Sequence, residues 1–152
     1  MHILEVQRGD YVISTDPSKL DLAVIHGYLS NESYWAQGRP LDVMRRALQH
    51  SLCFGVYLGR EQIGLARVVT DYATFAWLCD VFVLEAHRGQ GLGKWLIQTV
   101  VAHPALQGVL TVLGTRDAHG LYQGYGGFEP MQDLERWMLR PRRRPGGHAN
   151  DE

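Results

Sequence analysis

The chain has 152 residues, of which 45% are hydrophobic, a length that suits one domain with a single core and is short for two. Its 15 Lys and Arg residues balance 16 Asp and Glu residues and leave a formal charge of −1. The molecule as a whole therefore has no general attraction for nucleic acids or acidic membranes, and we expect neither as a partner. Any anion must be bound by a local site.

Cysteine and histidine usage excludes several further classes. Cys53 and Cys79 lie far apart without the spacing of a zinc site, and the histidines are scattered without a ligand pattern, so no metal is predicted. The first residues lack a basic stretch followed by an apolar one, and the most apolar run, FAWLCDVFVL, is short and contains Asp80. We expect a soluble, cytoplasmic protein with reduced thiols, either a monomer or a homodimer.

The first half of the chain alternates strand and helix signals. DYVIST is typical of a strand, and DPSKLDLAVIHGYL predicts a helix that begins after Asp16 with Pro17 in its first turn. PLDVMRRALQHS predicts a second helix, and residues 52–72 predict a hairpin that turns at LGREQ. FAWLCDVFVL follows as the next strand.

The second half repeats this alternation. GLGKWLIQTVVAH has helical spacing and stops at Pro104, GVLTVLGT predicts a strand, and residues 117–125 predict a short helix. Two weak strands ending near RWML complete the expected domain, which spans residues 1–139. Residues 140–152 form a basic tail rich in Pro and Gly that we expect to be disordered. The order of elements indicates a mixed α/β fold.

Three glycines within RGQGLGK lie between a predicted strand and a predicted helix. Such a turn is a ready anion site, because unpaired backbone N–H groups and the positive end of the helix point to one place. The dinucleotide fingerprint fails because Lys94 stands where its last glycine is required, and the ATP-type P-loop fails at Arg88 and Trp95. A tight turn without a ligand would need only one or two of these glycines.

VFVLEAHRGQGLGKWLI resembles the signature segment of the GNAT superfamily of N-acetyltransferases, in which Arg or Gln, two residues and Gly-x-Gly open the helix that holds the pyrophosphate of coenzyme A. The element order over residues 10–139 resembles the GNAT fold, a mixed and mostly antiparallel sheet flanked by helices. LYQGYGGFEP resembles the later segment of the family that contains a tyrosine, with one extra residue before Gly127-Phe128.

The resemblance implies an enzyme that transfers acetyl from acetyl-CoA directly to a primary amine. The family binds the pantetheine arm along the strand before the turn and the pyrophosphate at the turn itself. The residues implied here are Val81, Phe82, Val83, Arg88, Gly89, Gln90, Gly91, Leu92, Gly93 and Lys94.

Two side chains are candidates for the chemistry. Tyr122 matches the tyrosine that protonates the departing thiolate in the family, and its alternative role is packing on the core. Asp80 stands where GNAT enzymes often have a carboxylate facing the amine. It could accept a proton through water, bind the ammonium group, or be a structural carboxylate hydrogen-bonded to a neighbouring loop.

The acceptor pocket of this fold is built from the first two helices and the turn before the glycine strand. Here these segments contribute an aromatic and acidic set that would suit a small cationic amine, or would alternatively cover the core: Glu32, Tyr34, Trp35, Asp71 and Tyr72. A non-catalytic module that binds acetyl-CoA as a sensor is the second functional class open to the sequence.

Overall fold

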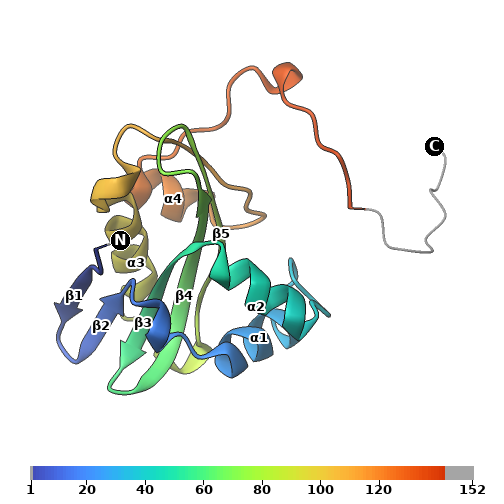
Figure 1. Ribbon diagram of the computed structural model, residues 1–152. Helices are drawn as coiled ribbons and strands as arrows, with labels where there is room; N and C mark the ends of the chain where they lie inside the picture. Colours follow the sequence, from blue (N-terminus) through green and yellow to red (C-terminus); the bar gives the residue numbers. More distant parts are fainter. Residues whose placement is uncertain (1, 143–152) are drawn as a thin grey trace.

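The computed structural model describes residues 2–142, which form one six-stranded sheet with helices on both faces (Figure 1). The strands follow chain order across the sheet: β1 (Glu5–Arg8), β2 (Tyr11–Ser14), β3 (Leu52–Leu58), β4 (Glu61–Thr70), β5 (Phe75–Val83) and β6 (Leu110–Val112). All neighbouring pairs are antiparallel except β5 and β6, which are parallel. The predicted mixed α/β fold with a mostly antiparallel sheet is confirmed.

Two hydrophobic cores lie on opposite faces of the sheet. Side chains alternate along a strand, so Phe54 belongs to one core and its neighbour Cys53 to the other. The first core packs under α3 (Leu92–Ala102) and α4 (His119–Gly126) through residues such as Leu96. The second packs under α1 (Leu22–Asn31) and α2 (Leu41–Gln49) through Ile25 and Met44. A central strand buried on both faces explains the continuous apolar runs of β3 and β4.

The sequence predicted most elements, but it joined two helices into one and missed a strand. The first helix is interrupted: Asp16 caps only the short 3-10 helix Pro17–Lys19, and Asp21 caps α1 through Val24 N–H. Strand β1 was not predicted. It is short and half polar, and it forms because Arg8 and Tyr11 close a tight hairpin around Gly9.

The two weak strands predicted to end near RWML are wrong for the described residues. After α4 the chain forms only the 3-10 helix Leu134–Arg136 and then runs away from the sheet (Figure 1). A strand requires a neighbour with which to share hydrogen bonds, and this segment has none among residues 2–142. The disorder predicted for the tail falls mainly on residues 143–152, outside the described ones. No helix in residues 2–142 is long and apolar enough to cross a membrane.

Candidate active site

The sheet opens between β5 and β6. The two strands pair only over Phe75–Trp77 and Leu110–Val112, and β5 then continues to Val83 without a partner on that side. A bulge at Asp80, whose φ is 52°, interrupts the pairing of β5 with β4 at the same level. The backbone of β5 from Leu78 to Val83 is therefore available to a ligand along the opening.

The glycine-rich turn lies at the far end of β5 and leads into α3. Gly89 and Gly91 have φ of 82° and 78°, which explains why glycine is required at both positions. A Cβ at Gly89 or Gly93 would meet no neighbouring atom, so the space in front of the turn is open. Within residues 2–142, the N–H groups of residues 89–94 make no hydrogen bond to the protein. The residues present fit a pyrophosphate group.

Charged side chains secure this turn. Arg88 donates to the Val83 carbonyl at 2.9 Å and to the Tyr28 hydroxyl at 3.0 Å, which ties the turn to the end of β5. Lys94 is exposed, with its ammonium group 5.0 Å from the centre of the Tyr125 ring. Arg8 reaches the turn from β1, with Nη1 3.5 Å from the Gly91 carbonyl oxygen. Sequence reasoning missed Arg8, because Arg8 and Gly91 are 83 residues apart in the sequence and come together only in the folded chain.

A cavity of about 500 Å³ occupies the opening between β5 and β6. Trp77, Cys79, Asp80 and Val81 line it from β5, and Tyr122 lines it from α4. Burial raises the pKa of Tyr122 to about 12, so its hydroxyl remains protonated at neutral pH. Tyr125 does not line this cavity.

The extra residue before Phe128 is absorbed at the end of α4. Gly127 takes a left-handed conformation with φ of 68°, and its N–H bonds to the Tyr122 carbonyl. The Phe128 N–H bonds to the same carbonyl at 3.2 Å, so the additional glycine forms a helix cap. The insertion therefore lies after Tyr122 and leaves the first turns of the helix unchanged.

Asp80 is buried and bound by three donors. Arg39 Nη1 and Arg67 Nε bond to Oδ2 at 2.8 and 2.7 Å, and Trp35 Nε1 bonds to Oδ1 at 3.0 Å. Burial alone would raise the pKa of Asp80, but the two guanidinium groups outweigh it and lower that pKa below its ordinary value. These contacts match the interpretation of Asp80 as a structural carboxylate. With its pKa lowered, Asp80 is a weak base.

The predicted acceptor residues divide into two groups. Tyr34 and Trp35 line the cavity and pack edge to face, with ring centres 5.0 Å apart. Glu32, Asp71 and Tyr72 do not line it. Asp71 instead closes the β4–β5 turn by accepting bonds from the Thr74 hydroxyl and from the N–H groups of residues 73–75, which lower its pKa. Glu32 ends α1.

Four further charged side chains of the cavity were missed by sequence reasoning. Arg39 reaches it from the α1–α2 loop, Arg116 and Asp117 from the β6–α4 loop, and Arg142 from the end of the described chain. The Arg116 guanidinium lies 3.7 Å from the centre of the Tyr34 ring, and the backbone N–H of Arg116 donates to the Tyr34 hydroxyl at 3.2 Å. The two loops meet there and close one side of the cavity. No sequence motif links loops so far apart in the chain.

Comparison with known proteins decides the family. The sequence model of the acetyltransferase (GNAT) family matches residues 21–128. The chain belongs to the GNAT family of acetyltransferases. A proposed acetyltransferase of the fungus Gibberella zeae is 39% identical over 120 residues, 66% of this chain and 67% of that protein.

Solved structures of GNAT proteins agree with this assignment. A proposed GNAT acetyltransferase from Xanthomonas campestris pv. campestris is 46% identical, with a TM-score of 0.82 over 93% of this chain and 94% of the other. An acetyltransferase from Clostridium acetobutylicum, solved with acetyl-CoA, has the same fold at 13% identity, with a TM-score of 0.60 over 86% and 94% of the two chains. The family's acetyl donor is acetyl-CoA, as the resemblance implied.

Proposed function

We propose that this GNAT protein transfers the acetyl group of acetyl-CoA to the primary amine of a small molecule, by direct attack of the amine on the thioester. One observation carries the proposal: the cavity in the β5–β6 opening joins the unpaired edge of β5 to the Tyr122 ring. Acetyl-CoA lies along Val81, Phe82 and Val83, with its pyrophosphate at residues 88–94. The cavity volume of about 500 Å³ is in the range of small-molecule sites.

Direct attack is favoured over an acetyl-enzyme intermediate by the state of the only thiol in the cavity. Burial raises the pKa of Cys79 to about 12, so almost no thiolate is available as a nucleophile at neutral pH. Cys53 is buried, and its pKa is raised to about 12 in the same way. The amine nitrogen must therefore reach the thioester carbon itself, which requires both substrates to be bound together.

The amine must lose a proton before it attacks. An alkyl amine with a pKa of about 10.4 is neutral in about one molecule in 2,500 at pH 7, which costs roughly 4.6 kcal/mol. Because the pKa of Asp80 is lowered, the proton passes to solvent and Asp80 orients the arginines around the cavity. Trp35, which also lines the cavity, suits the alkylammonium form as it arrives, whereas the Tyr34 ring already carries the Arg116 guanidinium.

In the transfer itself, a bond forms between nitrogen and the carbonyl carbon, and the carbon–sulfur bond breaks with its electron pair moving to sulfur. The Tyr122 hydroxyl donates a proton to the sulfur, and the proton that nitrogen then loses restores the phenol through solvent. A backbone N–H of β5 near the bulge stabilises the negative thioester oxygen of the intermediate.

A CoA-release assay tests this proposal. Purified protein and acetyl-CoA are combined with a panel of amines, amino acids and short peptides, and acetylated products are identified by mass. We expect release of CoA that depends on the amine, with initial rates that fit a ternary-complex mechanism. Calorimetric binding of acetyl-CoA without turnover of any amine would instead indicate the non-catalytic module.

A further inference from the structure

The charges around Asp80 do not balance. One carboxylate is shared by two guanidinium groups, those of Arg39 and Arg67, and the side chains of all three residues are at most 11% exposed. The lowered pKa of Asp80 keeps its charge at −1, so the buried cluster carries a formal charge of +1. An uncompensated charge with little access to water is costly, which makes such a cluster a natural site for an anion.

The excess charge faces the cavity. Arg39 lines it, and Arg39 Nη2 makes no hydrogen bond to any residue within 2–142, yet it is not sealed from solvent. Arg116 lines the same cavity and forms no ion pair with a carboxylate in that part of the chain. Its guanidinium lies over the Tyr34 ring, which fixes the position of this group. A guanidinium fixed in this way can bind a carboxylate through two hydrogen bonds.

We infer that the acceptor amine also carries a carboxylate, which Arg39 and Arg116 bind at the end of the cavity opposite the thioester. This inference rests on the proposed function and refines its substrate class. The pyrophosphate of acetyl-CoA does not supply the anion, because its turn lies beyond Val83 at the other end of β5. The arrangement also favours the chemistry, since nearby positive charge lowers the pKa of the substrate ammonium group.

Matched substrate pairs test the inference. Each pair is an amino acid and its carboxamide, and a simple diamine serves as a cationic comparison. We expect kcat/KM for the carboxylate member to exceed that of its amide by at least tenfold, with the difference mainly in KM. In Arg116→Gln the preference should fall to about threefold or less, while KM for acetyl-CoA stays constant.

Three further measurements make the test decisive. Arg39→Gln should abolish the preference, and Arg46→Gln, an exposed arginine of α2, should retain it. Thermal melting shows whether each variant folds. If Arg39→Gln does not fold, the comparison of Arg116→Gln with the wild type tests the inference. Equal or better turnover of amides or diamines by the wild type would overturn the inference and leave the proposed function standing. Absence of turnover with every amine would overturn both.

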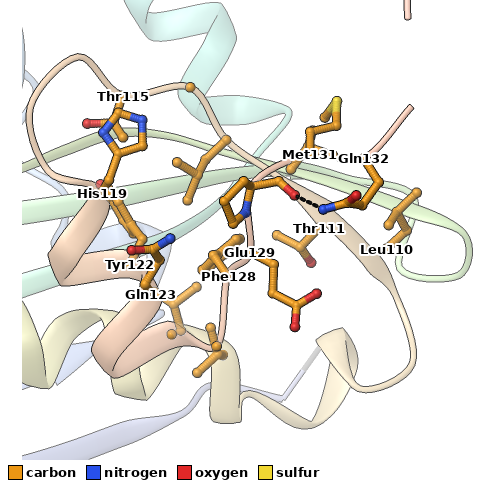
Figure 2. A pocket seen from close by; sticks show the side chains of 18 of the residues that line it. Leu110, Thr111, Thr115, His119, Tyr122, Gln123, Phe128, Glu129, Met131 and Gln132 are labelled. Atoms are coloured by element: carbon orange, nitrogen blue, oxygen red, sulfur yellow. Dashed lines mark hydrogen bonds between the residues drawn. The ribbon is translucent and has the colours of Figure 1, made fainter. Parts of the chain in front are cut away.

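An independent observation concerns the edge of the sheet. In the described part of the chain β6 is paired only with β5, and a groove of about 840 Å³ runs along its other side (Figure 2). Leu110, Thr111, Phe128 and Met131 line this groove, and Leu110 is 57% exposed. An open apolar edge of this kind attracts another strand.

The same chain carries a segment suited to that edge. Trp137, Met138 and Leu139 are 46%, 97% and 88% exposed, on a stretch that leaves the body of the molecule (Figure 1). Three consecutive apolar residues are typical of a strand buried on both faces, and helices cover both faces of this sheet. Residues 136–140 have the pattern of a seventh strand but pair with no strand of residues 2–142, although Trp137 touches the rim of the groove.

We propose that residues 136–140 of a second copy pair with β6 as a seventh strand, and that the exchange is reciprocal about a twofold axis. Each copy then supplies one strand and one edge, the closed arrangement of a strand-exchanged dimer. The pairing would bury all three exposed side chains. It would also cover the edge that each monomer leaves open.

Sedimentation or light scattering measures the expected dimer. Deleting residues 136–152 should give a monomer, whereas deleting only 141–152 should leave the dimer intact. Met138→Asp in the full chain, which keeps the backbone and adds a charge to the new strand, should also give a monomer, and circular dichroism checks that it folds. A monomeric wild type would overturn the proposal, because the segment would then have no second copy to pair with. A dimer that survives both the longer deletion and Met138→Asp would assign the interface elsewhere.

Discussion

Tyr122 is the residue on which the proposed chemistry depends most directly. Its ring lines both the catalytic cavity and the groove beside β6, and its pKa of about 12 keeps it protonated across the working range of pH. Burial makes the Tyr122 hydroxyl a weaker acid than a free tyrosine. We therefore expect it to transfer its proton to sulfur late, when the carbon–sulfur bond is largely broken. The activity should therefore rise from pH 7 to 9 as the amine deprotonates, with no loss from Tyr122 ionisation.

Tyr122→Phe keeps the ring and its edge-to-face contact with Phe128 but removes the proton. We expect kcat to fall about 10²-fold, the low end for general acid catalysis, because a thiolate is already a tolerable leaving group. Acetyl-CoA affinity and melting temperature should hardly change. Tyr125→Phe is the matched control, since Tyr125 lies one turn away beside Lys94, and a selective loss of kcat in that variant would reassign the acid.

Asp80 provides a prediction about stability. Asp80→Asn leaves two buried arginines without a countercharge, so we expect a loss of about 3–5 kcal/mol in the free energy of unfolding at pH 7. The folded-state pKa of Asp80 is lowered, so its stabilisation is present above the unfolded pKa of about 3.9 and is lost as pH falls through the folded pKa.

Urea unfolding of wild type and Asp80→Asn at several pH values measures this effect. The difference between them should be constant from pH 6 to 8 and should shrink below about pH 4. Asp71→Asn is the comparison, because Asp71 also has a lowered pKa but is exposed in a turn and pairs with no arginine. A pH-independent difference for Asp80→Asn would contradict the ion-pair account.

At the scale of elements, the turn between β5 and α3 combines open space with a backbone that only glycine adopts easily. Gly91→Ala puts a methyl group on a residue with φ of 78°, next to the Arg8 guanidinium nitrogens at 3.7 and 3.8 Å, where we expect it to crowd a bound pyrophosphate. We expect acetyl-CoA affinity to fall at least 30-fold in calorimetry.

Gly108→Ala separates this steric effect from backbone strain. Gly108 has φ of 74°, and a Cβ there would meet no atom within 4 Å, but it lies beyond the opposite end of α3. Both variants should lose about 1–2 kcal/mol of stability, the cost of left-handed backbone with a Cβ. Only Gly91→Ala should lose acetyl-CoA binding, and equal affinities would place the pyrophosphate elsewhere.

Elements with a local signal were predictable from the sequence, and those fixed by distant contacts were not. The RGQGLGK turn, the β3–β4 hairpin and α3 each have glycines or periodic apolar residues within one segment. Asp71 looked like an acceptor residue because its sequence position is close to the site, but its carboxylate is occupied by its own turn. Arg39 and Arg116 come to line one cavity only after the sheet has formed, so the sequence predicted an acidic pocket and missed these two positive charges.

At the scale of the whole molecule, the β5–β6 opening is held together by only three residue pairs, so a ligand that bridges it should stabilise the fold. A ligand at 100 times its Kd adds about 2.7 kcal/mol, which corresponds to roughly 5–10 °C in melting temperature for a domain of this size. We expect that shift with the wild type and a third of it or less with Gly91→Ala at the same acetyl-CoA concentration, because its affinity is at least 30-fold lower.

Hydrogen exchange shows where this stabilisation acts. The amides of residues 81, 83 and 89–94 should gain protection when acetyl-CoA binds, because the pantetheine arm and the pyrophosphate accept bonds that residues 2–142 leave unmade. The hairpin of β1 and β2 lies at the opposite edge of the sheet and should change little, apart from Arg8 beside Gly91. Protection spread evenly over all strands would mean that the ligand stabilises the sheet globally, without bonding to the β5 edge.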